Sequence, residues 1–268
     1  MQTFSSDGVR IAFIDESPAG GSADPVLLIH GFASSVRYNW RETGWIAFLV
    51  RNGFRVVAVD NRGHGESEKL YDPKDYSVAL MAGDARRLLD HLGIARAHVM
   101  GYSMGARISA SLAIGHPDRL RSAVFAGLAG NMVRPVAGTG PIAHALEAES
   151  IDAVANPTAR TFRAFADRTG GDLKALAACI RGAREPITRE MVASISCPVL
   201  VVAGGDDVIA GSADDLAGLI PGARALTVPR RDHMRTVGDR VYMDGVLAFL
   251  RAQVQAQSHG CRDGAAGP

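Results

Sequence analysis

The five residues GYSMG at positions 101–105 have the residue types and spacing that nucleophilic catalysis requires. This G-x-S-x-G pattern follows an apolar run and precedes a segment with helical periodicity, which is typical of a sharp turn that lifts a serine hydroxyl above a sheet. The two glycines remove the Cβ atoms that would clash in such a turn. Ser103 is therefore a candidate nucleophile. The alternative interpretation is that its hydroxyl only caps the following helix.

A serine hydroxyl becomes a good nucleophile only when a base takes its proton, and that base needs an acceptor to orient it. The apolar run 199–203 leads into Asp206 and Asp207, and the run 225–228 leads toward His233. Loops that follow parallel strands meet along one edge of an open sheet. Of the eight histidines, only His233 follows the last predicted strand. We therefore predict His233 as general base and one of the two aspartates as its partner.

The elements that must position these residues follow from the hydrophobic pattern. Continuous apolar runs indicate strands buried on both faces, as in a parallel sheet covered by helices. Such runs occur at 26–29, 56–59, 98–102, 121–127, 198–203 and 225–228, and an alternating pattern marks a further strand at 9–14. Helical spacing occurs at 45–51, 77–92, 106–114 and 240–251. Alternation of strands and helices predicts an α/β fold with a doubly wound, mostly parallel sheet.

The middle of the chain has a different pattern. Residues 129–196 contain no convincing strand, are rich in Ala, Arg, Thr and Gly, and hold short helical pieces such as 161–166. We predict a small α-helical cap inserted over the carboxyl edge of the sheet, with residues 1–128 and 197–252 forming the core. The small and polar residues of 253–268 predict a flexible tail.

Composition and charge exclude several classes of protein. The 268 residues, 47% hydrophobic and 21% charged, suit one large α/β domain with an insertion. The net charge is +1, and no block of one sign occurs, so we expect neither a nucleic-acid nor a membrane partner. No apolar stretch approaches the roughly 20 residues of a membrane span, and the first residues do not resemble a signal peptide.

Cofactor and metal motifs are also missing from the sequence. Cys179, Cys197 and Cys261 form no CxxC pair, which argues against a disulfide framework or a zinc site and favours a reducing compartment. No Gly-rich phosphate loop and no His, Cys and carboxylate cluster at metal-ligand spacing is present. We expect a cytoplasmic protein that needs neither metal nor cofactor. Its oligomeric state does not follow from the sequence.

Five ordered motifs together resemble the α/β-hydrolase superfamily across residues 4–252. They are HGF at 30–32, DNRGHGES at 60–67, GYSMG at 101–105, GGDD at 204–207 and DH at 232–233. The resemblance implies that the acid is Asp207, three residues after the glycine that ends its strand, with Asp206 as a helper or turn former. It also implies an oxyanion hole formed by the backbone N–H groups of Phe32 and Met104, worth about 3 kcal/mol each. His30 then braces this loop, and 60–67 forms a structural turn.

The activity that the resemblance implies is two-step acyl transfer on a carboxylic ester. The short insertion with few aromatics predicts a modest pocket for small to medium acyl groups. Its lining is expected to include Phe32, Met104, Tyr102, Phe162, Phe165 and Met234. The alternatives on the same triad are hydrolysis of carbon–carbon bonds in vinylogous diketones, of lactones or of thioesters, and a non-catalytic ligand-binding protein of the same fold. Epoxide hydrolases and haloalkane dehalogenases are disfavoured, because they normally carry Asp where this chain has Ser103.

Overall fold

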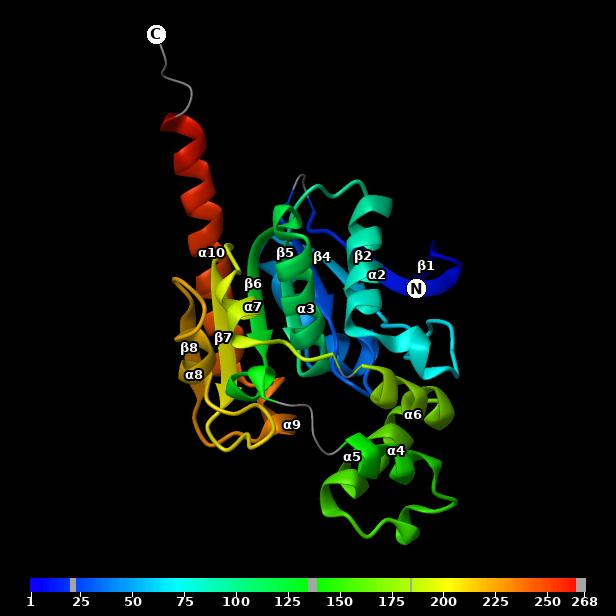
Figure 1. Cartoon of the computed structure of the whole chain (residues 1–268). Helices are drawn as coiled ribbons and strands as arrows, with labels where there is room; N and C mark the ends of the chain where they lie inside the picture. Colours follow the sequence, from blue (N-terminus) through cyan, green and yellow to red (C-terminus); the bar gives the residue numbers. More distant parts are fainter. Residues whose placement is uncertain (20–22, 135–138, 184, 264–268) are drawn as a thin grey trace.

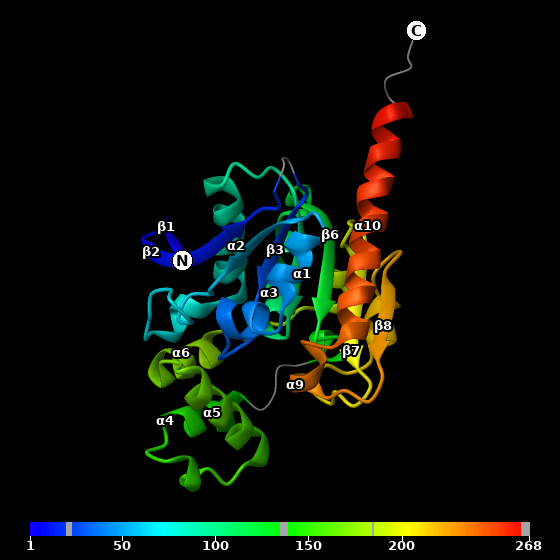
Figure 2. The same ribbon diagram turned by 180° about the vertical axis from the view of Figure 1, so that it is seen from behind.

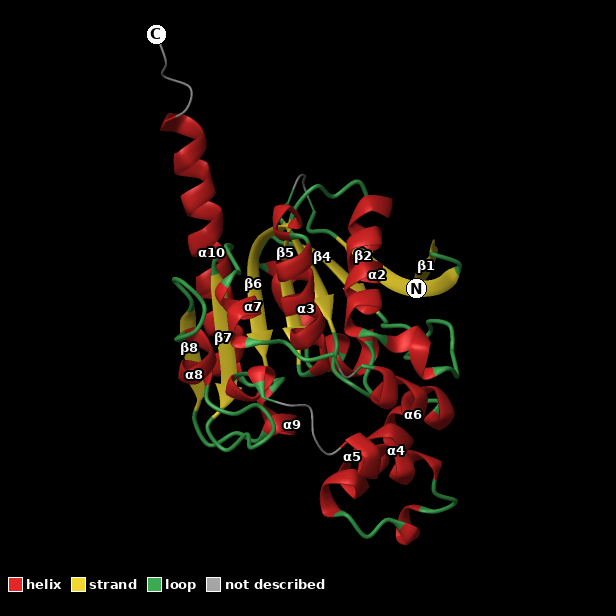
Figure 3. Ribbon diagram, in the orientation of Figure 1, coloured by secondary structure: helices red, strands yellow, loops and turns green. Residues whose placement is uncertain are grey.

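The structure, a computed structural model, describes residues 1–19, 23–134, 139–183 and 185–263. Eight strands form one sheet in the order β1-β2-β4-β3-β5-β6-β7-β8 (Figures 1 and 3). They are β1 (Gln2–Ser6), β2 (Val9–Glu16), β3 (Pro25–Ile29), β4 (Arg55–Val59), β5 (Ala97–Tyr102), β6 (Leu120–Ala126), β7 (Val199–Gly204) and β8 (Arg224–Val228). Strands β3 to β8 are parallel, and β1 and β2 add an antiparallel edge.

Helices cover both faces of this sheet. The α-helices are α1 (Trp45–Arg51), α2 (Val78–His91), α3 (Met104–Gly115), α4 (Thr139–Glu147), α5 (Pro157–Thr169), α6 (Leu173–Gly182), α7 (Arg189–Ala193), α8 (Ala213–Ala217), α9 (His233–Thr236) and α10 (Arg240–Asp263). A π-helix η1 (Val36–Arg41) and 3₁₀ turns η2 (Pro73–Tyr76), η3 (Pro117–Arg119), η4 (Gly130–Val133) and η5 (Ile151–Ala153) lie between them. Figure 1 shows α2 and α3 on one face, and Figure 2 shows α1 and α10 on the other.

The two faces bury separate hydrophobic cores. On one face, side chains of α2 and α3 such as Leu88 and Ile108 pack against Leu27, Val57 and Val99 of the strands. On the other face, side chains of α1 and α10 pack against alternate residues of the same strands. Burial on both sides explains why the central parallel strands β3 to β7 are nearly continuous apolar runs, whereas the edge strand β8 has only Val228 buried. The predicted fold class is confirmed, and each parallel strand lies within one residue of its predicted limits.

The antiparallel edge was only partly predicted. Strand β1 was missed because its pattern alternates and only Phe4 and Ser6 are buried. The turn to β2 has positive φ at both Asp7 and Gly8, with values of 48° and 84°. This is the conformation of a two-residue hairpin, for which Asp-Gly is a strong sequence signal. That dipeptide could have predicted the β1–β2 hairpin.

The middle block forms a helical layer beside the carboxyl ends of the strands (Figure 1). Among its described residues no strand occurs, and α4, α5 and α6 pack around their own small core, which includes Leu146, Leu176 and Cys179. The layer is narrower than the predicted range 129–196. Met132 of η4 and Val192 of α7 belong instead to the core that α2 and α3 cover, because both are apolar side chains that pack under the sheet's own helices.

The C-terminal helix is longer than predicted. Helix α10 runs from Arg240 to Asp263 and projects beyond the body of the protein (Figure 1). The helix therefore extends past its predicted end at residue 251 and into the segment that was predicted as a flexible tail. Residues 252–259, AQVQAQSH, contain no Gly or Pro and include good helix formers, so nothing stops the helix there. Residues 264–268 lie outside the described part. No helix within the described residues combines the length and hydropathy of a membrane span.

Candidate active site

The turn between β5 and α3 holds Ser103 in a strained backbone conformation. Its φ is 56° and its ψ is −115°, a region that costs a non-glycine residue about 1–3 kcal/mol. A Cβ on Gly101 would collide with the Gly105 carbonyl, and one on Gly105 would collide with the Ile29 carbonyl. Both glycines of the motif are thus required by close backbone contacts. The Ser103 side chain makes no capping hydrogen bond to α3, which removes the interpretation of Ser103 as a helix cap.

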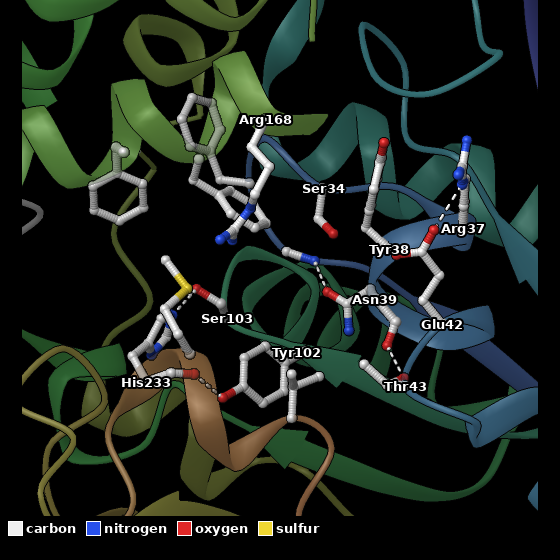
Figure 4. Close-up of a pocket in the computed structure, with 16 residues that line it drawn as sticks. Ser34, Arg37, Tyr38, Asn39, Glu42, Thr43, Tyr102, Ser103, Arg168 and His233 are labelled. Atoms are coloured by element: carbon white, nitrogen blue, oxygen red, sulfur yellow. Dashed lines mark hydrogen bonds and ion pairs between the residues drawn. The ribbon is translucent and has the colours of Figure 1, made fainter. Parts of the chain in front are cut away.

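Three side chains from distant loops form a hydrogen-bonded row at this turn. His233 Nε2 lies 3.0 Å from Ser103 Oγ, and His233 Nδ1 lies 2.9 Å from Asp207 Oδ2. His233 is 8% exposed and Asp207 is 5% exposed. Asp207 follows β7, and His233 begins α9 after β8. The sheet topology therefore brings together the three residues that the sequence placed at the ends of separate strands, and Figure 4 shows Ser103 and His233 side by side.

The hydrogen bonds around Asp207 fix the orientation of its carboxylate and indicate the tautomer of the His233 imidazole. Asp207 Oδ1 accepts the backbone N–H groups of Ile209 at 3.0 Å and Ala210 at 2.9 Å. Oδ2 is then free to accept the His233 Nδ1–H, which leaves the Nε2 lone pair toward Ser103 Oγ. Asp206 is exposed and donates its backbone N–H to the Arg231 carbonyl. Asp207, rather than Asp206, is the aspartate that faces the histidine.

Two further contacts position the histidine. Asp232 caps α9 by accepting the N–H groups of Met234 and Arg235. The Tyr102 hydroxyl donates to the His233 carbonyl at 2.5 Å, and burial raises the pKa of Tyr102 above its ordinary value, so the phenol remains a donor. Tyr102 was predicted only as a pocket residue, and this positioning contact could not be read from the sequence.

The loop after β3 carries a candidate oxyanion donor, Phe32. His30 Nδ1–H donates to the Gly31 carbonyl at 2.7 Å, and the Asn61 N–H donates to His30 Nε2 at 3.0 Å. Burial lowers the pKa of His30 to about 4, so it braces the loop as a neutral imidazole. No described acceptor takes a hydrogen bond from the backbone N–H of Phe32 or Met104. Both N–H groups are thus available to an oxyanion near Ser103.

Ser103 lies between two chambers. The first, the His233 chamber, has a volume of about 550 Å³ and is lined by Tyr102, Ser103, Phe165, His233 and Met234 among others. The second, the Arg107 chamber, has a volume of about 480 Å³ and is lined by residues that include Met104, Arg107 and Ile142. Phe32, Ser103 and Phe162 line both. Every residue predicted for the pocket therefore lines at least one chamber.

Arg107 is a site residue that the sequence analysis missed. It lies four residues after Ser103 in α3, was assigned to the helix alone, and is 8% exposed. One signal could have found it, because Arg107 is the single charged residue in an otherwise apolar or small-residue helix. Arg168 of α5, which reaches toward the His233 chamber from the helical layer, was also missed (Figure 4).

The 60–67 turn is held by structural contacts. Asp60 accepts the N–H groups of Val36 and Glu66 at 2.7 Å each, and Arg62 pairs with Asp84 at 2.7 Å. Burial lowers the pKa of His64 to about 3. In the part of the chain that the structure describes, no three His, Cys, Asp or Glu side chains converge as metal ligands would.

Comparison with known proteins gives the following relatives. An alpha/beta hydrolase fold family model matches residues 24–138. Epoxide hydrolase B of Mycobacterium tuberculosis (strain H37Rv) is 39% identical over 135 residues, which are 50% of this chain and 35% of that protein. The match therefore spans about a third of that relative's length. Asp207 and His233 lie outside the span of the family model, so their placement depends on the geometry.

Two solved structures resemble almost the whole chain. A hydrolase from Pseudomonas aeruginosa PA01 has a TM-score of 0.77 and 26% identity, covering 93% of this chain and 97% of that one. A thermophilic esterase from Thermogutta terrifontis has a TM-score of 0.74 and 24% identity, covering 94% of this chain and 97% of that one. The overall fold of nearly the whole chain therefore has counterparts in known structures.

Proposed function

We propose that this chain, which belongs to the α/β-hydrolase fold superfamily, is a serine hydrolase that cleaves carboxylic esters of small to medium acyl groups through a covalent acyl-enzyme. One observation carries the proposal, the continuous row from Asp207 through His233 to Ser103 with contacts of 2.9 and 3.0 Å. Ser103 is the nucleophile, His233 the general base and Asp207 the carboxylate that orients it.

In the first step, His233 Nε2 takes the Ser103 proton while Oγ attacks the ester carbonyl carbon. The carbonyl oxygen becomes an oxyanion, which receives the N–H groups of Phe32 and Met104. The protonated His233 then gives its proton to the leaving alkoxide as the carbon–oxygen bond breaks. This step yields the free alcohol and an ester between the acyl group and Ser103.

In the second step, water replaces the alcohol. His233 takes a proton from water as the hydroxide attacks the acyl carbon, and the same two N–H groups stabilise the second oxyanion. Collapse breaks the bond to Ser103 Oγ, which recovers the proton from His233, and the carboxylic acid leaves. Asp207 stabilises the imidazolium in both steps, because its carboxylate is already fixed by two backbone N–H groups.

The serine at the elbow separates this chemistry from that of the epoxide hydrolase relative. A carboxylate nucleophile opens an epoxide to an ester, which water then cleaves. Attack by Ser103 would leave an ether, and the triad has no route to hydrolyse an ether. The residue type at position 103 therefore favours acyl transfer over epoxide opening, even though part of the chain is 39% identical to epoxide hydrolase B.

The chambers support a substrate of moderate size. Together they offer space on both sides of Ser103, with volumes of about 550 and 480 Å³, and aromatic side chains of the helical layer border them. Pockets of this size accommodate small molecules of drug-like dimensions. We infer that the acyl and alcohol parts of the ester occupy separate chambers.

A labelling experiment tests the proposal. Wild-type protein is treated with a fluorophosphonate and assayed with p-nitrophenyl butyrate, beside Ser103→Ala and the matched control Ser194→Ala, which changes an exposed serine. We expect one phosphonate per chain on wild type and on the control, none on Ser103→Ala, and turnover only where labelling occurs. Labelling of Ser103→Ala at the wild-type rate would disprove the assignment. Ligand-induced thermal shifts without turnover by wild type would instead indicate a non-catalytic binding protein.

A further inference from the structure

The Arg107 chamber holds a buried guanidinium that makes no ion pair or hydrogen bond with a described side chain. Arg107 is 8% exposed, its side chain makes no ion pair or hydrogen bond with a described residue, and its Nη1 is fully buried without a partner. Burial lowers its pKa, and the nearby Glu185 carboxylate opposes this effect. Glu185 itself is exposed and accepts the Val78 N–H at 2.6 Å. An unpaired buried charge is costly, so the site favours an anion supplied from outside.

The lining of this chamber indicates the rest of the ligand. Among the described residues that line it, none is Asp or Glu, and Arg134 adds a second cation. Two more buried atoms there, Asn131 Oδ1 and Thr139 Oγ1, also lack hydrogen-bond partners. Most of the remaining lining is apolar: Phe32, Met104, Leu128, Ile142, Phe162, Ile180, Ala183, Val208 and Ile209. The chamber thus suits an apolar chain that carries a negative charge.

The position of His233 decides which part of the substrate enters this chamber. His233 lines only the His233 chamber, and Met104 lines only the Arg107 chamber. Since His233 must protonate the leaving oxygen, the alcohol part has to lie on the side of His233. The acyl chain then extends on the other side of Ser103, into the Arg107 chamber.

We propose that the acyl group of the substrate carries a free carboxylate that binds Arg107, so that the enzyme acts on monoesters or lactones of dicarboxylic acids. This inference rests on the proposed serine-hydrolase function. The fork of a guanidinium matches a carboxylate with two parallel hydrogen bonds. Ser103 directly precedes α3 and Arg107 lies in its first turn, which rises about 5 Å along the axis, so a chain of a few methylene groups, as in glutarate, can span the two.

The test compares two esters within each variant. The kcat/KM for p-nitrophenyl hemiglutarate is divided by that for p-nitrophenyl hexanoate, a neutral ester of similar length. This ratio is independent of the fraction of active protein. We expect wild type to prefer the hemiglutarate, Arg107→Met to lower the ratio by about ten- to a hundredfold, and Arg107→Lys to retain part of it.

Arg168→Met is the matched control, because it removes a cation from the His233 chamber instead. Its ratio should stay at the wild-type value. The proposal is overturned if wild type prefers hexanoate, if Arg107→Met lowers both rates equally, or if the ratio falls in Arg168→Met and not in Arg107→Met. The last result would place the carboxylate on the alcohol side.

A binding measurement separates this proposal from the function on which it rests. If wild type cleaves neither ester and takes up no fluorophosphonate, the hydrolase proposal fails. The carboxylate site is then tested by the melting temperature in 10 mM glutarate, with acetate at the same ionic strength as reference. Glutarate should raise the melting temperature of Ser103→Ala and not that of the Ser103→Ala, Arg107→Met double variant. No difference between these proteins would disprove the site.

Discussion

Two histidines of this protein lie beside an aspartate at the carboxyl edge of the sheet. His233 Nδ1 is 2.9 Å from Asp207 Oδ2, and His30 Nε2 is 3.9 Å from Asp60 Oδ1. His30 and Asp60 follow β3 and β4, whereas Asp207 and His233 follow β7 and β8. Both pairs are largely buried, so residue type, strand position and burial do not distinguish them.

The difference between the two pairs lies in the second nitrogen of each ring. Both nitrogens of His30 are engaged by the backbone, Nδ1 with the Gly31 carbonyl and Nε2 with the Asn61 N–H. The Nε2 of His233 instead faces the hydroxyl of Ser103. A histidine can act as a base only where its free lone pair meets a transferable proton. The comparison shows that a structural histidine and a candidate catalytic histidine differ in the partner of Nε2: a backbone N–H for His30 and a serine hydroxyl for His233.

Replacing each histidine with glutamine should give the sharpest contrast. His233→Gln removes the base, and we expect kcat for p-nitrophenyl butyrate to fall by about a millionfold, as for bases of comparable triads. His30→Gln removes a brace, and its main effect should be a loss of stability of about 2–4 kcal/mol, because buried backbone groups lose their partners. Urea unfolding and single-turnover kinetics measure the two effects. Equal losses of kcat in the two variants would refute the assignment of His233 as the base and of His30 as a structural residue.

The adjacent residues Asp206 and Asp207 provide a second comparison, of which aspartate supports His233. Asp207→Asn should lower kcat by about 10⁴-fold, because the amide favours the wrong tautomer of His233. Asp206→Asn is the matched control, and we expect a change below about threefold, since Asp206 is exposed and lies outside the row. Steady-state kinetics on purified variants measure both. A similar loss of kcat in both variants would show that catalysis does not depend on the 2.9 Å contact between Asp207 and His233.

The elements that could be predicted from the sequence are those whose burial is local and continuous. Strands β3 to β7 are covered on both faces, so each contains a continuous apolar run with narrow limits. The edge strand β1 has little burial, and the helices α4 and α6 pack against each other rather than on the sheet, so their patterns are weaker. The residues after the strand ends, Asp207 and His233, could be placed because topology alone brings those ends together.

The contacts that could not be predicted depend on packing between distant segments. The Tyr102 hydroxyl meets a carbonyl 131 residues further along the chain. The environment of Arg107 is formed by α3, η4, α4, α5 and α6, whose relative positions no local pattern encodes. The hydrogen bonds of His30 follow the same rule. The sequence indicated that it braces a loop, but the tautomer depends on Asn61 from the end of another strand.

The smallest expected effect is a pH dependence of stability from the structural histidines. Burial lowers the pKa of His30 and of His98 from 6.5 to about 4 and that of His64 from 6.5 to about 3. As the pH falls below 6.5, the unfolded chain binds these protons before the folded protein does. Stability is therefore retained above about pH 6.5 and lost as the pH falls toward 4, with a slope of about 1.4 kcal/mol per pH unit from each histidine.

Urea unfolding at pH 8, 7, 6 and 5 tests this sign and size in wild type and His64→Asn. The variant lacks one of these three histidines, so its free energy of unfolding should fall less steeply between pH 6 and 5, by about 1.4 kcal/mol per pH unit. Between pH 8 and 7 the two proteins should have nearly the same slope, because these histidines are largely neutral in the folded and unfolded states there. An unchanged slope between pH 6 and 5 would mean that His64 is protonated in the folded protein. His64 would then carry a charge in the resting protein, whereas we expect His233 to become charged only during catalysis.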